Sequence, residues 1–382
     1  MIKTDSFTGR CVLMVAHCAG MLDLVALPVW VGTLISKYGL DPQQAGGLAT
    51  LFLVGAVLSS LFFAPRLPRY NGRVAATCGF GLAVLSFLAL SMTRDYTTMM
   101  ALHALAGASA GCALSFTHGT IGRSADPHRL FALVGIAIGF FALAFFAVAP
   151  QLVAAFGGGA LFQLFAAIMA VATLATAAGF PQPAPSDKAP GIAPTAGRLD
   201  PAVWYVVFGV GCLALVQSMT FSFVERIGID RGFGFAAVSG VLIALGMVNL
   251  VPAPLAVLLQ RRLPGHRVML AGPIIQAAIV LTITQSSTFP PYALATAVLV
   301  SVLIFTHTFA FGAIAALDPS GRAAAATPAT LMTGAAIGPL LGGTLVKSAG
   351  YGSIGIAAAV LAVLAVLSFR RAQSRPVLVP SL

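Results

Sequence analysis

Long apolar segments separated by short polar turns make up almost the whole chain. Their apolar positions follow the helical period rather than the alternation of a β-barrel strand, and each segment can cross a hydrocarbon layer of about 30 Å. In the first half the pattern predicts membrane helices at residues 11–34, 44–64, 74–92, 97–122, 129–150 and 158–180. In the second half it predicts them at residues 202–224, 234–258, 267–286, 291–316, 323–346 and 351–369. The expected fold class is an all-α integral membrane protein with twelve transmembrane helices.

Short sequences recur half a chain apart. Residues 37–41 (KYGLD) are echoed by residues 226–230 (RIGID), and residues 116–118 (FTH) by residues 305–307. The pair Asp126-Pro127 returns as Asp318-Pro319, and both pairs are expected to cap the start of a helix. We therefore expect two pseudo-symmetric six-helix bundles at residues 1–180 and 201–382, the second with a short cytoplasmic tail. The Pro- and Ala-rich residues 181–200 would form a cytoplasmic linker.

Composition supports a lipid environment. Charged residues are 8% and hydrophobic residues 59% of the chain, against about 25% and about 45–50% in soluble domains. The five cysteines lie in or beside apolar segments without a pairing pattern, so a disulfide framework is not expected. The chain has no nucleotide-binding loop, hydrolase metal spacing or nucleophile constellation, so we expect neither an enzyme nor a cofactor.

The net charge of +11 has a distribution that predicts topology. With the N-terminus inside, all but five of the 21 Lys and Arg residues fall on cytoplasmic segments, the exceptions being Lys37, Arg94, Arg226, Arg231 and Lys347. This is the positive-inside pattern, which places both termini in the cytoplasm and needs no nucleic-acid partner. The compact size and short loops favour a monomer in a bacterial inner membrane.

Two loops carry a family resemblance. Residues Arg69-Tyr70-Asn71-Gly72-Arg73-Val74 resemble the Asp-Arg-x-Gly-Arg-Arg gating loop of the major facilitator superfamily, with the acidic member missing. The second half has a basic counterpart in residues 262–267, and the six-plus-six arrangement with a central linker also resembles that family. The resemblance implies secondary transport by alternating access, with gating roles for Arg69, Gly72, Arg73, Arg262 and Arg267.

The eleventh predicted helix contains the sequence GAAIGPLLGG at residues 334–343. It resembles the Gly-x-x-x-Gly-Pro-x-x-Gly-Gly pattern that antiporters of the family carry on helix five. Glycines at this spacing allow close helix approach and proline allows bending. The expected helix-bending residues are Gly334, Gly338, Pro339, Gly342 and Gly343.

Ionisable residues lie on only a few predicted helices. Asp23 is the one acid well within a predicted span, and such a group costs roughly 2.5–3.5 kcal/mol on insertion. It could serve as a proton carrier, as a counter-charge for a cationic substrate, or as a buried acid bonded to a neighbouring helix. Four histidines (His17, His103, His118 and His307) also fall on helices one, four and ten, which the resemblance implies line a central cavity.

His103 lies where the family often has an arginine associated with proton coupling, and histidine can exchange a proton near neutral pH. We therefore expect Asp23 and His103 to couple protons to transport. His118 and His307, related by the duplication, are either site residues or histidines bonded to backbone carbonyls. The expected substrate contacts are Asp23, Trp30, His118, Gln217, Thr306 and His307.

No Lys or Arg lies deep in a predicted span, which disfavours a strongly anionic substrate. The interpretation is a proton-linked transporter of a small neutral, zwitterionic or cationic organic compound, with export slightly favoured and no resident metal. One alternative is copper import, because His17 and Met21, like Met99 and His103, are four residues apart and their side chains suit Cu(I). Another is a membrane receptor or scaffold without transport.

Overall fold

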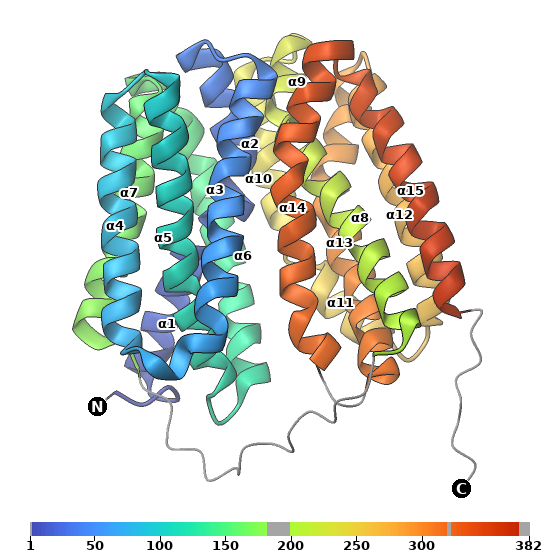
Figure 1. Ribbon diagram of the computed structural model, residues 1–382. Coiled ribbons are helices and arrows are strands. Elements are labelled where there is room, and N and C mark those ends of the chain that lie inside the picture. Colours follow the sequence, from blue (N-terminus) through green and yellow to red (C-terminus); the bar gives the residue numbers. More distant parts are fainter. Residues whose placement is uncertain (1, 182–198, 319–321, 374–382) are drawn as a thin grey trace, which may run out of the picture. The chain divides into compact units, whose positions relative to one another are not determined.

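The computed structural model describes residues 2–181, 199–318 and 322–373, and all its regular elements there are helices apart from an isolated bridge residue at Lys3 (Figure 1). Contacts divide the chain into two compact units, Met1–Gly191 and Ile192–Leu382. Residues 182–198, which make up most of the predicted linker, lie outside the described part of the chain, as does Pro319.

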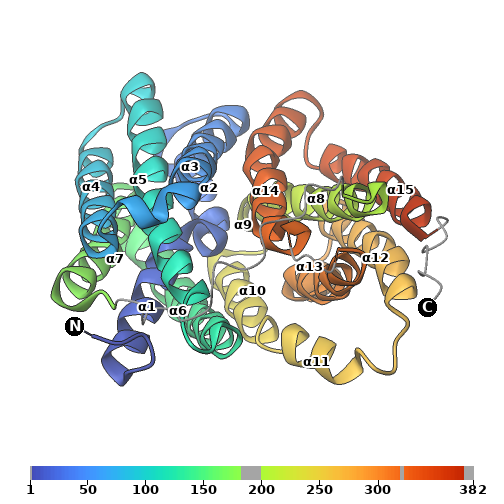
Figure 2. The same cartoon turned by 60° about the horizontal axis from the view of Figure 1, so that its bottom comes forward.

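Unit 1 consists of α1 (Phe7–Gly20), α2 (Leu22–Tyr38), α3 (Pro42–Phe63), the 3-10 helix η1 (Ala64–Arg69), α4 (Gly72–Met92), α5 (Tyr96–Gly122), α6 (Pro127–Phe156) and α7 (Gly159–Gly179). Helix α5 packs against α3 and α4, and α4 packs against α7 (Figure 2). Glycines permit the crossing of α5 on α3, because a Cβ at Gly107 would lie 1.9 Å from the carbonyl oxygen of Phe52. A Cβ at Gly111 would lie 2.4 Å from the carbonyl oxygen of Ala56.

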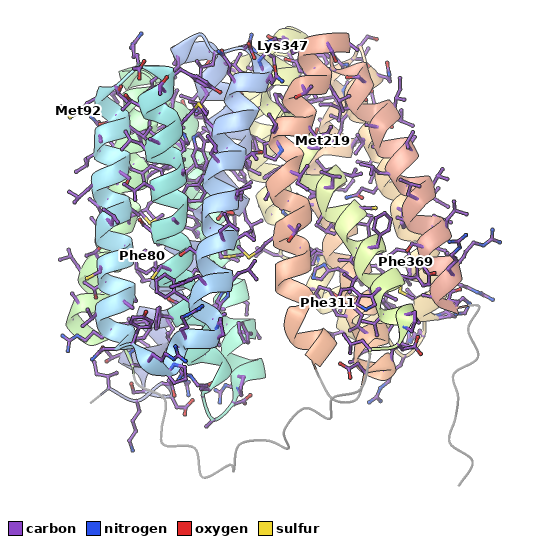
Figure 3. The ribbon with its side chains drawn as sticks, in the orientation of Figure 1. Phe80, Met92, Met219, Phe311, Lys347 and Phe369 are labelled. Atoms are coloured by element: carbon purple, nitrogen blue, oxygen red, sulfur yellow. The ribbon has the colours of Figure 1, made fainter. Side chains whose placement is uncertain are left out.

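Unit 2 consists of α8 (Pro201–Phe221), α9 (Val224–Asp230), α10 (Phe235–Val248), α11 (Pro252–Leu259), α12 (Gly265–Gln285), α13 (Phe289–Leu317), α14 (Arg322–Ala349) and α15 (Gly352–Gln373). Helix α8 packs against α14 and α15, and α12 packs against α13 and α15. Phe80 in unit 1 and Phe369 in unit 2 are fully buried, whereas Met92 projects outward and is 87% exposed (Figure 3). Many large apolar side chains are exposed on both units, as lipid-facing positions require.

The predicted fold class is confirmed. Within the described residues, eleven helical segments are long and apolar enough to span a membrane, and α14, with 28 residues, is a further long helix at the eleventh predicted position. Asp126 caps α6 as predicted, since its carboxylate accepts a hydrogen bond of 3.0 Å from the backbone N–H of Arg129. Asp318 follows the last residue of α13, and α14 begins at Arg322.

Three of the predicted helices are interrupted, which their apolar pattern did not predict. The segment 11–34 breaks at Met21, the segment 202–224 ends at Phe221 and resumes as the short α9, and the segment 234–258 divides into α10 and α11. The last break coincides with Pro252, which has no N–H group to continue the helical hydrogen bonds.

Candidate functional site

Asp23 lies at the break between α1 and α2. It belongs to the first turn of α2 and is only 5% exposed. Its carboxyl group interacts with the backbone N–H groups of Asp23 itself and of Leu24. Those groups carry the partial positive charge of a helix N-terminus, which stabilises a carboxylate there. Within the described part of the chain Asp23 has no ion-pair partner, so helix geometry rather than a cationic side chain accommodates it.

His103 is fully buried on α5 and stacks on Trp30 of α2, with ring centroids 5.5 Å apart and planes inclined by 23°. Its Nδ1 lies 2.7 Å from the carbonyl oxygen of Met99. Because a carbonyl only accepts, Nδ1 carries the hydrogen and Nε2 holds the free lone pair. Nε2 has no hydrogen-bond partner within the described residues, and neither has Nε1 of Trp30. The structure therefore brings a predicted coupling residue and a predicted substrate contact into one stack.

An aromatic cluster surrounds this stack. Trp30 makes edge contacts with Phe52, Phe87 and Phe165 at centroid distances of 5.2, 6.3 and 5.1 Å. Phe162 meets the edge of His103 at 5.7 Å. Two unpartnered polar atoms inside an apolar cluster are costly, so they mark a place where a proton or a hydrogen-bonding group would be stabilised.

His118 pairs with His17, a contact that the sequence did not indicate. Nδ1 of His17 and Nε2 of His118 are 3.0 Å apart, and the ring centroids are 5.1 Å apart. One ring must donate and the other accept, so the pair shares a single hydrogen at this contact. The pair joins α1 to α5 four residues before the break at Met21.

The proposed copper ligands are divided between these two contacts. His17 pairs with His118, and His103 binds the backbone oxygen of Met99 rather than presenting Nδ1 beside the Met99 sulfur. Among the described residues, no group of three or more His, Cys, Asp or Glu side chains could hold a metal ion.

In unit 2, Gln217 of α8 is buried, with 7% of its surface exposed. Its Oε1 lies 3.5 Å from Nε2 of Gln276, and that nitrogen also donates to the carbonyl oxygen of Leu213 at 3.1 Å. The side-chain nitrogen of Gln217 has no partner within the described residues. It remains available to donate to a bound molecule.

Thr306 and His307 of α13 have different surroundings. Thr306 is 1% exposed and packs against Gly272, where an added Cβ would meet its hydroxyl oxygen at 2.3 Å. His307 places Nδ1 2.7 Å from the carbonyl oxygen of Leu303 and its ring 4.9 Å from that of Phe311. In this structure His307 is therefore bonded to a backbone carbonyl, which is one of the two alternatives that the sequence left open.

The predicted gating loop of unit 1 is tied to a helix end. Asn71 stands at the variable position of the family loop, directly before Gly72, and its side-chain oxygen caps α4 by accepting from the N–H groups of Arg73 and Val74, at 3.0 and 3.3 Å. The Arg73 guanidinium donates to the carbonyl oxygen of Ala177 at the C-terminal end of α7, with Nε at 2.9 Å. Arg69 closes η1, and Gly72 begins α4. In unit 2, Arg262 and Arg267 are exposed between α11 and α12 and at the start of α12.

The glycines of α14 face α8. A Cβ at Gly334 would lie 2.5 Å from the carbonyl oxygen of Gly211, and one at Gly338 would lie 2.6 Å from the backbone nitrogen of Met219. A Cβ at Gly342 would lie 2.9 Å from the Met219 carbonyl oxygen, while Pro339 and Gly343 are also buried. α14 is continuous through this motif, so its glycines provide close helix packing here.

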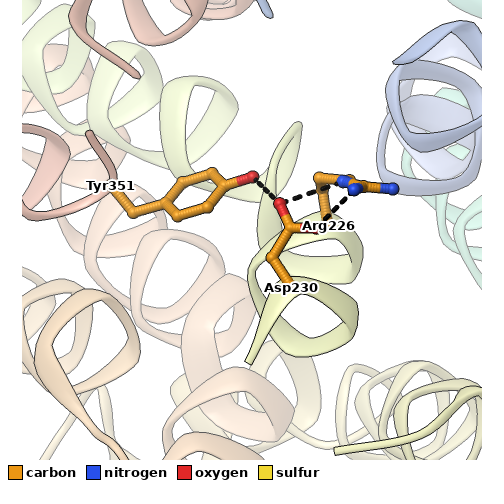
Figure 4. Close-up of polar contacts among 3 residues, drawn as sticks. All are labelled: Arg226, Asp230 and Tyr351. Carbon is orange, nitrogen blue, oxygen red and sulfur yellow. Dashed lines mark hydrogen bonds and ion pairs between the residues drawn. The ribbon is translucent and has the colours of Figure 1, made fainter. Parts of the chain in front are cut away.

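Sequence reasoning missed a polar group in unit 2. The Asp230 carboxylate forms an ion pair with Arg226, its neighbour four residues earlier on α9, and accepts a hydrogen bond of 2.6 Å from the Tyr351 hydroxyl (Figure 4). Burial, together with the neighbouring Asp230 carboxylate, raises the pKa of Tyr351, which keeps its hydroxyl a donor. The sequence singled out residues 226–230 by their repeat, and Arg226 also by its place outside the cytoplasmic segments, but neither signal predicts this contact.

Glu225, beside this group, was also missed because the predicted helix ended at residue 224. Its Oε2 is buried without a hydrogen-bond partner within the described residues. Glu225 is therefore, like Asp23, an acid within a segment that is long and apolar enough to span a membrane.

Buried polar groups on a two-unit helical membrane fold define a multi-pass membrane transporter, and comparison with known proteins supports this class. The family model described as Major Facilitator Superfamily matches residues 12–320, and the chain belongs to that superfamily. No curated protein matches the chain.

Solved structures share the fold. The chain is similar to a crystal structure of a mutant of the nucleoside transporter NupG, with a TM-score of 0.73 and 13% identity over 95% of this chain and 98% of that one. It is also similar to an inward-facing, occupied bacterial homologue of the human lysosomal transporter Spinster, with a TM-score of 0.67 and 13% identity over 95% and 92% of the two chains.

Proposed function

We propose that the chain is a proton-linked secondary active transporter that moves a small neutral, zwitterionic or cationic organic compound by alternating access. The observation that carries the proposal is Asp23, a buried acid at a helix break without an ion-pair partner in the described part of the chain. The N–H groups of α2 offset only part of the cost of burying a carboxylate, so this carboxyl group is most stable when it carries a proton or faces a cation. In proton-coupled transport the carboxyl group alternates between a protonated form and a charged form that faces a cation.

His103 provides the second step of the proposal. Its free Nε2 can accept a proton, and an imidazolium stacked on Trp30 would gain a cation–π interaction. Trp30 lies two turns after Asp23 on α2. A change of charge at Asp23 that moves α2 would therefore alter the contact between Trp30 and His103.

The substrate class follows from the available polar groups. In unit 2 the Gln217 amide supplies a donor that has no partner among the described residues, and Asp23 supplies a negative charge for a cationic or zwitterionic compound. Thr306, His118 and His307 remain proposed contacts. NupG, which has a similar fold, is described as a nucleoside transporter. Nucleosides are neutral compounds, so the first substrate screen should include them.

We propose that the protein lies in a bacterial inner membrane with both termini cytoplasmic and with residues 181–200 as a cytoplasmic linker, and of the two directions of transport export is slightly favoured. The distribution of Lys and Arg along the sequence supports this orientation. Fusions of green fluorescent protein and of alkaline phosphatase to the C-terminus test it. Fluorescence without phosphatase activity is expected, and the reverse pattern would contradict the assignment.

Proton release from purified protein in weak buffer tests the function. On addition of neutral, zwitterionic and cationic compounds, we expect at least one compound to release protons from wild type and not from Asp23→Asn. Asp95→Asn is the matched control, because Asp95 caps α5 outside the spans and asparagine also caps helices. Equal release from wild type and Asp23→Asn would contradict the proposal. Stoichiometric Cu(I) binding lost in His103→Gln, with no release by any organic compound, would favour the copper alternative.

A further inference from the structure

Unit 2 contains an apolar cleft of about 410 Å³ that shares only Thr306 with the proposed substrate contacts. Its lining residues come from α10, α11, α12 and α13. Figure 2 shows the course of these four helices. Helix α11 packs against α13 and makes no substantial contact with α12. The volume falls within the roughly 300–1,000 Å³ of known small-molecule sites.

The helix break at Pro252 opens the cleft between α11 and α12. Because α10 ends at Val248 and α11 restarts at Pro252, α11 takes its own direction. The counterpart in unit 1, α3, runs unbroken for 22 residues and packs closely along α5. The cleft is therefore a feature of the second half and not a general consequence of the duplicated fold.

The lining of the cleft suits hydrocarbon. Its polar members are Ser301 and Thr306. Ser301 donates to the Asn249 side chain at 3.4 Å, and Thr306 packs against Gly272. Neither lining group is among the buried polar atoms that lack a partner. The remaining lining residues are apolar, so an apolar chain would fill the cleft without stranding a hydrogen-bonding group.

The rim of the cleft is also apolar and exposed. Val251 is 55% exposed, Leu255 40% and Ile275 49%. Leu258, one turn beyond Leu255 on α11, is 73% exposed. In a membrane protein such side chains face lipid, so an acyl chain can enter the cleft from the bilayer.

One end of the cleft is strongly basic. The lining residue Val268 directly follows Arg267, and Arg261 and Arg262 lie just beyond the end of α11. All three arginine side chains are exposed. No Asp or Glu occurs between residues 231 and 317, so no acid from α10 to α13 neutralises them. A negatively charged head group would find three cations beside an apolar slot.

We propose that this cleft binds an anionic phospholipid, with one acyl chain between α11 and α12 and the phosphate at Arg261, Arg262 and Arg267. Basic pockets between transmembrane helices bind anionic lipid head groups by the same combination of charge and apolar surface. The bound chain fills the space left by the break at Pro252 and holds α11 in place relative to α12.

Native mass spectrometry of the detergent-purified full chain tests this site. The probes are dioleoyl phosphatidylglycerol and dioleoyl phosphatidylcholine, which share acyl chains and differ in head-group charge. We expect wild type to retain one phosphatidylglycerol and to prefer it at least tenfold. The double variant Arg261→Gln with Arg262→Gln should weaken binding by roughly fivefold for each arginine removed. Ala271→Phe, which fills the cleft from α12, should abolish it.

Matched controls separate this site from lipid held non-specifically. Arg370→Gln with Arg371→Gln removes the same charge from the end of α15, and Ala278→Phe adds the same ring to an exposed position two turns along α12. Both controls should bind as wild type. If Ala271→Phe does not fold, Ala271→Leu replaces it. Equal binding of the two lipids, equal losses in the controls, or retention after the cleft is filled would each overturn the proposal.

Discussion

His103 and Trp30 form a stacked pair that joins α5 to α2 inside the aromatic cluster of unit 1, with their ring centroids 5.5 Å apart. The imidazole donates to the Met99 carbonyl oxygen, and its other nitrogen has no partner in the part of the chain that the structure describes. Loss of the tryptophan removes a fully buried ring that contacts three phenylalanines. We expect Trp30→Ala to lower the free energy of unfolding by about 3–5 kcal/mol, measured by thermal or denaturant unfolding in detergent.

Trp30→Phe separates packing from chemistry in the same place. It keeps an aromatic face for His103 and should lose substantially less stability than Trp30→Ala. If the two variants are equally stable, the stack does not contribute to the packing of α2 on α5.

The contact between His17 and His118 should be measurable as a coupling energy. We expect His17→Ala and His118→Ala each to destabilise unit 1, and the double variant to lose less than the sum. The difference should be about 0.5–1.5 kcal/mol, the net value of one hydrogen bond. A double-mutant cycle of thermal unfolding at neutral pH gives this number, and strict additivity would mean that the 3.0 Å contact is not formed in the membrane protein.

Gly107 should tolerate no side chain. Because its Cβ would lie 1.9 Å from the Phe52 carbonyl oxygen, Gly107→Ala must push α3 and α5 apart. We expect loss of at least about 1–3 kcal/mol of stability, seen as a lower unfolding temperature. Gly135→Ala in α6 is the control, since nothing lies within 4 Å of its added Cβ, and it should stabilise the helix by up to about 1 kcal/mol. The opposite order of the two variants would contradict the packing of α5 on α3.

Tyr351 should hold the end of α9. Tyr351→Phe removes the hydroxyl that donates to Asp230 while keeping the ring, so the remaining Arg226–Asp230 ion pair must stabilise the carboxylate alone. We expect hydrogen exchange of the α9 amides to accelerate several-fold, with little change in α12. Tyr70→Phe, at a 47% exposed ring in unit 1, serves as the control and should change neither segment. Unchanged exchange in α9 would show that the hydroxyl contributes nothing there.

The fold was predictable because the insertion of a helix into a bilayer depends on the length and composition of the segment, and both can be read directly from the sequence. The N-cap at Asp126 was predictable for a similar reason, since capping depends on residues only three apart. The break at Pro252 follows from proline chemistry once the helix is located. The break at Met21 carries no such local signal, because neither Met21 nor Asp23 forbids a helix.

The contacts of the candidate site were less predictable. His17 and His118 are 101 residues apart, and their meeting depends on how α1 and α5 are rotated about their axes. The duplication pointed to His118 and His307 as a pair, whereas the structure gives each of them a different partner within its own unit. Glu225 was overlooked because a helix boundary was misplaced by a few residues, and boundaries are set by tertiary packing as well as by composition.

The glycine-lined crossing of α5 on α3 has a mechanical consequence. With backbone directly against backbone at Gly107 and Gly111, no flexible side chain lies between the two helices to absorb a displacement. We expect α3 and α5 to move together as one rigid unit. Bending within unit 1 is then concentrated where the helical hydrogen bonds are already interrupted, at the junction of α1 and α2. Asp23 lies at this junction, so in the proposed transport cycle a change of charge on its carboxyl group would change the angle between α1 and α2.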